Sequence, residues 1–272
     1  MSDKVLSFYD EYTRRGGEDQ RATSSRSNSL EFHYTKKALS EFITRGSRVL
    51  EVGCGTGHYG IYFADKCKEY VGIDIYQPHL DIFNSKIKEN RLTNVSCQKG
   101  DAMNLSGIDN DSFDVILCLG PMYHLPKEDR EAAFAECARI CKPNGIAAFA
   151  YVNKIGAYVG GCVHDEMRSD YPNKETNSYV LKQGTSDLNP GVFYFSMPEE
   201  MTESASRHGL TKIRNMGTDF FVTMSVVDKM DDEKFEIYME LADEMVKYES
   251  CAGMSNHALL ICRKSNISPS PK

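Results

Sequence analysis

The sequence predicts an α/β fold built on a parallel, doubly wound sheet with helices on both faces. From about residue 46 to residue 152, short apolar runs rich in β-branched residues alternate with longer segments of helical periodicity. Short loops join these segments. Because each crossover helix must return the chain to the same edge of the sheet, this rhythm is typical of parallel strands.

The N-terminal thirty residues are polar but carry Phe8, Tyr9 and Tyr12. A solvated tail would not need three aromatic side chains, so docking over a ligand cleft is at least as good an interpretation. Residues 21–29, rich in Ser and Arg, are expected to be irregular. Helical periodicity begins near Leu30, and we expect that helix to end at Gly46.

The alternating segments follow in order. The apolar run at 113–119 is continuous, as in a strand covered on both faces, and Pro143-Asn144-Gly145 stops the helix before the fifth strand. The expected strands are residues 48–52, 70–75, 95–99, 113–119 and 146–152, and the expected helices are residues 58–66, 77–90 and 127–141.

Beyond residue 152 the alternation breaks. Residues 153–195 carry glycines, prolines and tyrosines without a clear period, which favours a lid insertion. Its candidate acceptor contacts are Tyr151, Asn153, Tyr158, His164, Asp165, Arg168, Tyr171 and Tyr179, although cap packing is the better interpretation of any one of them. We expect helices at 198–208 and 235–248, strands at 211–215 and 258–262, and a disordered tail at 265–272.

We therefore expect a single domain over residues 1–264. It would comprise an N-terminal cap segment (1–45), a ligand-binding core (46–152), the lid (153–195) and the C-terminal part of the sheet (196–264).

Composition narrows the possible functions of the 272-residue chain. A net charge of −7 disfavours nucleic-acid binding, which normally needs a basic surface. The nine cysteines form no CxxC pair or Cys/His cluster, so neither a metal site nor a disulfide framework is expected. Free thiols, no signal peptide and no apolar run of about 18 residues favour a soluble, cytoplasmic protein without membrane contact.

The residues from Val49 to Gly57 form the centre of the predicted site. A buried strand interrupted by Glu51 runs into glycines at 53, 55 and 57, which lets a ligand approach the backbone closely. Gly55-x-Gly57-x-x-Gly60 also matches a dinucleotide-binding fingerprint. In that fingerprint the first glycine follows the strand directly, and here that residue is Gly53, so the match is out of register by two residues.

In register, Glu51-Val52-Gly53-Cys54-Gly55-Thr56-Gly57 resembles the E/D-x-G-x-G-x-G motif of class I S-adenosylmethionine-dependent methyltransferases. The resemblance continues with Asp74 after the second strand, Gly100-Asp101-Ala102 after the third, and 113–119 as the fourth. It implies a Rossmann-like, seven-stranded, mostly parallel sheet with an antiparallel last strand. It also implies S-adenosylmethionine as cofactor, S-adenosylhomocysteine as product, and as cofactor-binding residues Glu51, Gly53, Cys54, Gly55, Gly57, Asp74, Ile75, Asp101, Ala102 and Leu119.

The segment Gly120-Pro121-Met122-Tyr123-His124 resembles a clade of bacterial small-molecule methyltransferases, as does Leu30-Glu31-Phe32. His124 and Tyr123 are therefore expected to face a small-molecule acceptor, where a base assists transfer to a hydroxyl, amine or thiol. His124 could equally cap the following helix. Two alternatives stay open: an RNA methyltransferase and a non-catalytic S-adenosylmethionine-binding regulator. The atom that accepts the methyl group and the oligomeric state stay undetermined.

Overall fold

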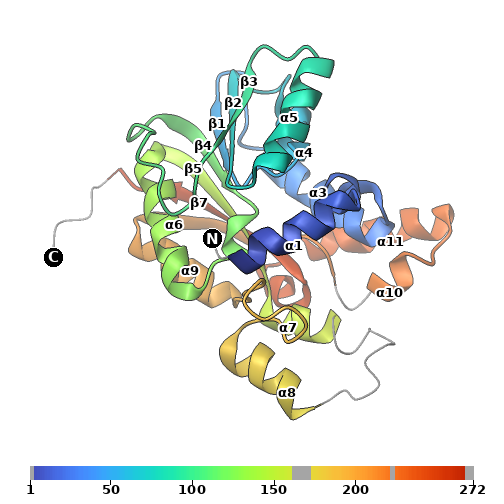
Figure 1. Ribbon diagram of the computed structural model, residues 1–272. Helices are drawn as coiled ribbons and strands as arrows, with labels where there is room; N and C mark the ends of the chain where they lie inside the picture. The colour runs from blue at the N-terminus through green and yellow to red at the C-terminus, as the bar shows by residue number, and fades with distance from the viewer. Residues whose placement is uncertain (1–2, 161–172, 221–223, 267–272) are drawn as a thin grey trace.

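The structure is a computed structural model that describes residues 3–160, 173–220 and 224–266. Within these ranges seven strands form one sheet in the order β3-β2-β1-β4-β5-β7-β6 (Figure 1). Only β7 runs antiparallel to its neighbours, β5 and β6, so the expected mostly parallel sheet is confirmed. The strands are β1 (Arg48–Val52), β2 (Glu69–Asp74), β3 (Val95–Lys99), β4 (Phe113–Cys118), β5 (Cys141–Val152), β6 (Leu210–Gly217) and β7 (His257–Lys264).

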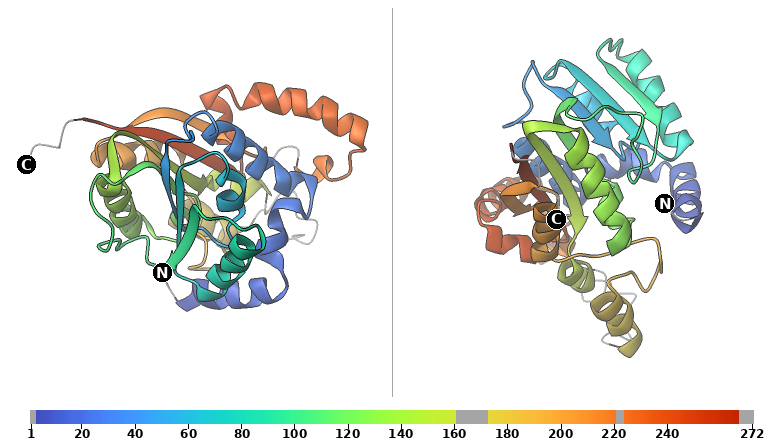
Figure 2. Two further views of the ribbon diagram at one scale, coloured as in Figure 1. Left: turned by 90° about the horizontal axis from the view of Figure 1, so that it is seen from above. Right: turned by 90° about the vertical axis from the view of Figure 1, so that its left-hand side faces the viewer.

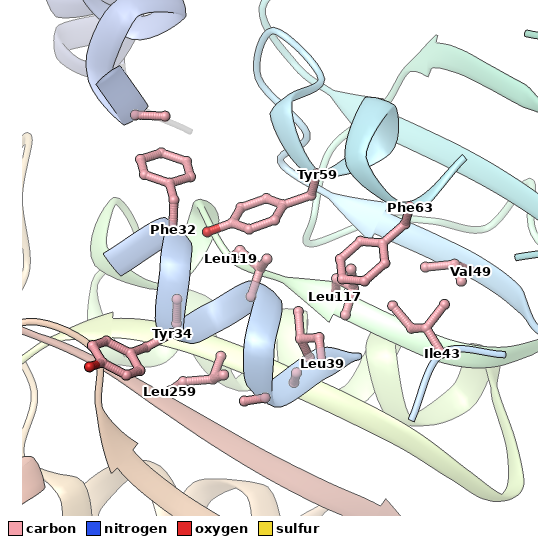
Figure 3. Close-up of a cluster of buried hydrophobic side chains, with 14 of the residues drawn as sticks. Phe32, Tyr34, Leu39, Ile43, Val49, Tyr59, Phe63, Leu117, Leu119 and Leu259 are labelled. Carbon is pink, nitrogen blue, oxygen red and sulfur yellow. The ribbon is translucent and has the colours of Figure 1, made fainter. Parts of the chain in front are cut away.

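Helices cover both faces of the sheet (Figures 1 and 2). Successive residues of β4 enter different cores, with Val115 and Leu117 in one and Ile116 and Cys118 in the other, because side chains alternate across a strand. Figure 3 shows part of the first core, in which the ring of Phe32 lies beside that of Tyr59, while Phe63 and Leu117 belong to the same buried cluster. Helices α3 (Arg26–Leu39), α4 (His58–Phe63), α5 (Gln77–Glu89) and α11 (Asp232–Met245) cover that core, and α6 (Lys127–Ile140) and α9 (Pro198–Arg207) cover the other.

The N-terminal segment is more ordered than its composition indicates. It forms α1 (Asp3–Arg14), α2 (Gly17–Gln20) and the 3-10 turn η1 (Arg21–Thr23). The expected irregular stretch at 21–29 is wrong, because Ser25 accepts a hydrogen bond from the backbone N–H of Asn28 and so caps α3. The expected end of this helix at Gly46 is also wrong, since α3 ends at Leu39 with Ser40 as its C-cap.

The insertion after β5 contains no strand in its described part, 153–160 and 173–195. It forms α7 (Lys154–Tyr158), α8 (Lys174–Thr176) and the π-helical turn η4 (Asn177–Gln183). Four of the candidate acceptor contacts lie outside the described residues: His164, Asp165, Arg168 and Tyr171. Most of the expected tail lies outside them as well. The remaining short elements are η2 (Pro121–Tyr123), α10 (Met224–Val227) and η5 (Glu249–Met254). Over the described ranges, no helix combines the length and apolarity needed to cross a membrane.

Candidate active site

A cavity lies at the carboxyl ends of β1, β2, β3 and β4, where α/β sheets generally bind ligands. The segments that follow these strands form its base, and the N-terminal segment forms its roof. Its lining comprises Tyr9, Glu18, Arg21, Ala22, Glu31, Phe32, Glu51, Gly53, Cys54, Gly55, Thr56, His58, Tyr59, Asp74, Ile75, Tyr76, His79, Gly100, Asp101, Ala102, Leu119, Gly120, Pro121, Tyr123, His124 and Leu125.

The glycine turn between β1 and α4 presents bare backbone to this cavity. Gly53, Gly55 and Gly57 all have positive φ, at 76°, 50° and 82°, a conformation that costs other residues free energy. A Cβ on Gly53 would lie 2.5 Å from Cδ of Pro121, so only glycine allows the two segments to pack this closely.

Gly57, unlike Gly53 and Gly55, packs against a helix instead of facing the cavity. It does not line the cavity, and a Cβ there would lie 2.0 Å from Cδ2 of Phe83 on α5. Its glycine identity therefore serves the packing of the turn against α5. The other predicted cofactor-binding residues all line the cavity.

Asp74 and Asp101 carry carboxylates to the cavity from the ends of β2 and β3. The backbone N–H groups of Gly55 and Tyr76 each donate to one Asp74 oxygen, both at 2.8 Å, which leaves each oxygen further capacity to accept. Burial raises the pKa of Asp74, and these backbone donors oppose that rise. Asp101 accepts a hydrogen bond from the backbone N–H of Met103 at 3.0 Å.

Glu51 is buried beneath the glycine turn, with 1% of its surface exposed. The Tyr70 hydroxyl donates to its carboxylate at 2.6 Å. Burial raises the pKa of Glu51 to about 8; the Tyr70 hydrogen bond opposes this rise and the charge of Asp74 adds to it. At neutral pH this side chain therefore carries a proton in most molecules, and a cationic ligand group beside it would favour ionisation.

His124 is held at the end of η2 by hydrogen bonds to both ring nitrogens. Nδ1 lies 2.8 Å from the carbonyl oxygen of Val192, and Nε2 lies 2.7 Å from the hydroxyl oxygen of Tyr9. Because a carbonyl can only accept, Nδ1 carries the hydrogen and Nε2 accepts from Tyr9. Burial lowers the pKa of His124 to about 4, although the Val192 contact opposes this, so the ring is neutral at pH 7.

Tyr123 lies beside His124, with ring centroids 4.7 Å apart. Both residues line the cavity. Burial raises the pKa of the Tyr123 phenol, and its backbone carbonyl accepts from the N–H of Tyr194 at 2.8 Å. This hydrogen bond fixes η2 to the segment around residue 194.

The N-terminal segment supplies functional candidates that sequence reasoning did not identify. Arg21 Nη1 donates to Glu31 at 2.9 Å, and Arg21 Nε is buried without a hydrogen-bond partner. Among the described lining residues, Arg21 is the only arginine or lysine. Glu18 also faces the cavity, near Gly55. The three aromatic residues signalled docking of this segment, but no spacing rule brings Arg21 to the cavity.

The tyrosines considered for the lid lie elsewhere. The Tyr151 hydroxyl donates to Asn215 at 2.9 Å inside the sheet, and Asn153 caps α7 by accepting from the N–H of Ile155. Tyr158 and Tyr179 are likewise absent from the described cavity lining. None of these four side chains lines the described cavity.

Known proteins with similar sequences are methyltransferases. The sequence profile of a family described as "Methyltransferase domain" matches residues 49–145. Ubiquinone biosynthesis O-methyltransferase of Neisseria meningitidis serogroup C (strain 053442) is 32% identical over 191 residues, which are 69% of this chain and 74% of that protein.

Solved structures share the fold at low identity. One is the complex between the Haloferax volcanii Trm112 methyltransferase activator and the putative methyltransferase. The TM-score is 0.64 at 16% identity, and the match covers 98% of this chain and 100% of that chain. Another is magnesium protoporphyrin IX methyltransferase from Synechocystis PCC 6803 with bound S-adenosylhomocysteine, with a TM-score of 0.60, 13% identity and 96% of each chain covered. Together with the Neisseria relative, the glycine turn and the strand order establish that the chain belongs to the class I S-adenosylmethionine-dependent methyltransferases.

Proposed function

We propose that the chain transfers a methyl group from S-adenosylmethionine to a small-molecule acceptor in this cavity. In this proposal Asp74 accepts the ribose hydroxyls, Asp101 and Ala102 hold the adenine, and the Gly53–Gly55 turn receives the amino-acid end. Ile75, Cys54 and Leu119 provide apolar contacts. These residues suit the cofactor chemically, because Asp74 keeps lone pairs available for hydroxyl groups and the glycine turn exposes its backbone to the cavity.

Arg21 and Glu51 match the two charges of the cofactor's amino-acid end. Arg21 has an unpartnered Nε and would hold the carboxylate. Glu51 would ionise beside the ammonium group, since a nearby cation favours the carboxylate form. When bound, S-adenosylmethionine supplies an electrophilic methyl group on a sulfonium. The protein's part is to position the acceptor and to remove its proton.

The observation that carries the small-molecule proposal is the roof over the cavity. Tyr9, Glu18 and Arg21, from α1, α2 and η1, line the same cavity as the strand ends. A polymer would have to flip one nucleotide past this segment into the cavity, whereas a small molecule can fit entirely beneath it. Carboxylates outnumber cations in the described lining, which also opposes the phosphate backbone of RNA.

The test combines binding and turnover. Calorimetry should show S-adenosylmethionine binding, and a metabolite library should contain acceptors that release S-adenosylhomocysteine. Binding without release from any library member would contradict the small-molecule enzyme and favour a regulator. A salt-sensitive shift of RNA in a low-salt gel would favour the nucleic-acid alternative instead.

A further inference from the structure

The lone pair of His124 is already occupied. Its Nδ1 hydrogen is directed to Val192, so Nε2 is the nitrogen that can take a proton, and the Tyr9 hydroxyl donates to it at 2.7 Å. A direct transfer from acceptor to His124 would require Tyr9 to leave. Without such a movement, a proton from an acceptor can reach Nε2 only through the oxygen of Tyr9.

Tyr9 is placed to act at this point. It lines the cavity together with His124 and Asp74, and its ring centroid lies 5.1 Å from that of His79 and 5.3 Å from that of His124. Since its hydrogen is directed to His124, its oxygen lone pairs remain available to accept a second hydrogen bond.

The helix that carries Tyr9 is fixed on both sides of the cavity. Towards the cofactor end, Thr13 Oγ1 lies 2.9 Å from His79 Nε2, and the Tyr76 hydroxyl donates to Asp10 at 2.5 Å. On the other side, the rings of Phe8 and Phe193 meet edge to face with centroids 5.2 Å apart. These contacts hold Tyr9 against His124.

We propose that Tyr9 is a catalytic residue, which takes the proton of an acidic acceptor hydroxyl, such as a phenol, while its own proton passes to His124. This inference rests on the proposed function. As the new carbon–oxygen bond forms and the carbon–sulfur bond breaks, the acceptor's O–H electron pair stays on oxygen. The acceptor proton binds the Tyr9 oxygen, the Tyr9 proton binds Nε2, and the resulting imidazolium releases a proton to solvent after the product leaves.

The surroundings of the pair favour an acidic acceptor. Burial is the main cause that lowers the pKa of His124 to about 4, and the charge of Arg21 lowers it further. Burial, Glu18, Tyr123 and Asp74 all raise the pKa of Tyr9, while Arg21 opposes them. Because His124 is a weak base and the Tyr9 hydroxyl is a weak acid, the pair cannot readily deprotonate an aliphatic alcohol. A phenol ionises near pH 10, about as readily as free tyrosine, and so suits this pair better.

Two phenols of different acidity test this chemistry. At about pH 8.5, 4-nitrophenol is largely ionised, whereas 4-methylphenol, which ionises near pH 10 as tyrosine does, retains its proton. We expect Tyr9→Phe to lower kcat/KM for 4-methylphenol by about 100-fold or more, because one general acid–base contribution is typically about 10²- to 10⁴-fold, and to leave kcat/KM for 4-nitrophenol nearly unchanged. Tyr12→Phe, which removes a hydroxyl from the same helix outside the described cavity lining, should leave both rates unchanged.

A second measurement does not depend on turnover. In ligand-free protein with ¹⁵N-labelled histidine, Tyr9→Phe should move the His124 Nε2 resonance towards that of a free imidazole nitrogen, and Tyr12→Phe should not. An unmoved resonance, an equal loss of rate with both phenols, or faster methylation by Tyr9→Phe would each overturn the proposal. The proposal would also be overturned if the wild-type protein methylated neither phenol. If that protein still binds S-adenosylmethionine and methylates another small molecule, the proposed function survives this failure.

Discussion

Asp74 shows how one side chain can serve both the fold and the ligand. The backbone N–H groups of Gly55 and Tyr76 orient its carboxylate and leave lone pairs available. We expect Asp74→Ala to weaken S-adenosylmethionine binding by about 10- to 100-fold, because one or two charge-assisted hydrogen bonds are lost. Calorimetry measures this affinity. Asp81→Ala, at an exposed position on α5, is the matched control, and equal affinities for the two variants would refute the role of Asp74.

Glu51 predicts a pH dependence of stability. The unfolded chain loses this proton near pH 4.5 and the folded chain only near pH 8, so the folded state binds more protons between these values. The free energy of unfolding must therefore fall as pH rises through this window, by up to roughly 4 kcal/mol from this group. Glu51→Gln should remove that fall, so its stability relative to wild type should increase from pH 5 to pH 8 in urea unfolding. A difference that stays constant with pH would contradict the prediction.

At the scale of the element, the turn between β1 and α4 depends on glycine for two reasons. At Gly53 the restriction comes from Pro121 and at Gly57 from Phe83, in addition to positive φ at both. The sequence motif treats these glycines alike, but only Gly53 and Gly55 line the cavity. The distinction needs the position of α5, which the motif does not contain.

Gly57→Ala should destabilise the protein without removing a cavity-lining residue. We expect a loss of about 3 kcal/mol, from overpacking against Phe83 and from the left-handed backbone. Urea unfolding measures it. Gly107→Ala is the control, because its Cβ would meet no atom within 4 Å and its φ is not positive. Equal stability of the two variants would show that Phe83 moves aside at little cost.

At the scale of the whole molecule, the N-terminal segment joins the two ends of the cavity. It contacts His79 and Tyr76 near the cofactor end and His124 on the other side. Ligand binding beneath it should therefore slow amide hydrogen exchange in α1, because local opening of the helix becomes less favourable when the cavity is filled.

Hydrogen exchange with mass spectrometry, with and without S-adenosylhomocysteine, checks this coupling. Slower exchange is expected in both α1 and the β1–α4 turn, while α9, on the other core, serves as the internal reference. Protection of the turn alone would show that α1 opens independently of the ligand.

The sequence by itself determined the order of the strands and helices from residue 48 to residue 152 and the residues at the strand ends. Apolar periodicity and the motif depend on local backbone geometry, and the carboxyl ends of parallel strands meet at one edge whatever the loops do. Glu51, Asp74, Asp101 and His124 could therefore be named in advance as neighbours of one site.

Only the tertiary structure decided what covers that site. Tyr9 and His124 are 115 residues apart and meet at 2.7 Å, and Arg21 meets Glu31 through the packing of η1 on α3. These contacts arise from helices docking on a completed sheet, and their energy depends on surfaces that exist only after folding. The N-terminal aromatic residues indicated that this segment docks over the cleft, but no local pattern encodes these contacts. The position of Arg21 and the hydrogen-bond partner of His124 therefore could not be derived from the sequence.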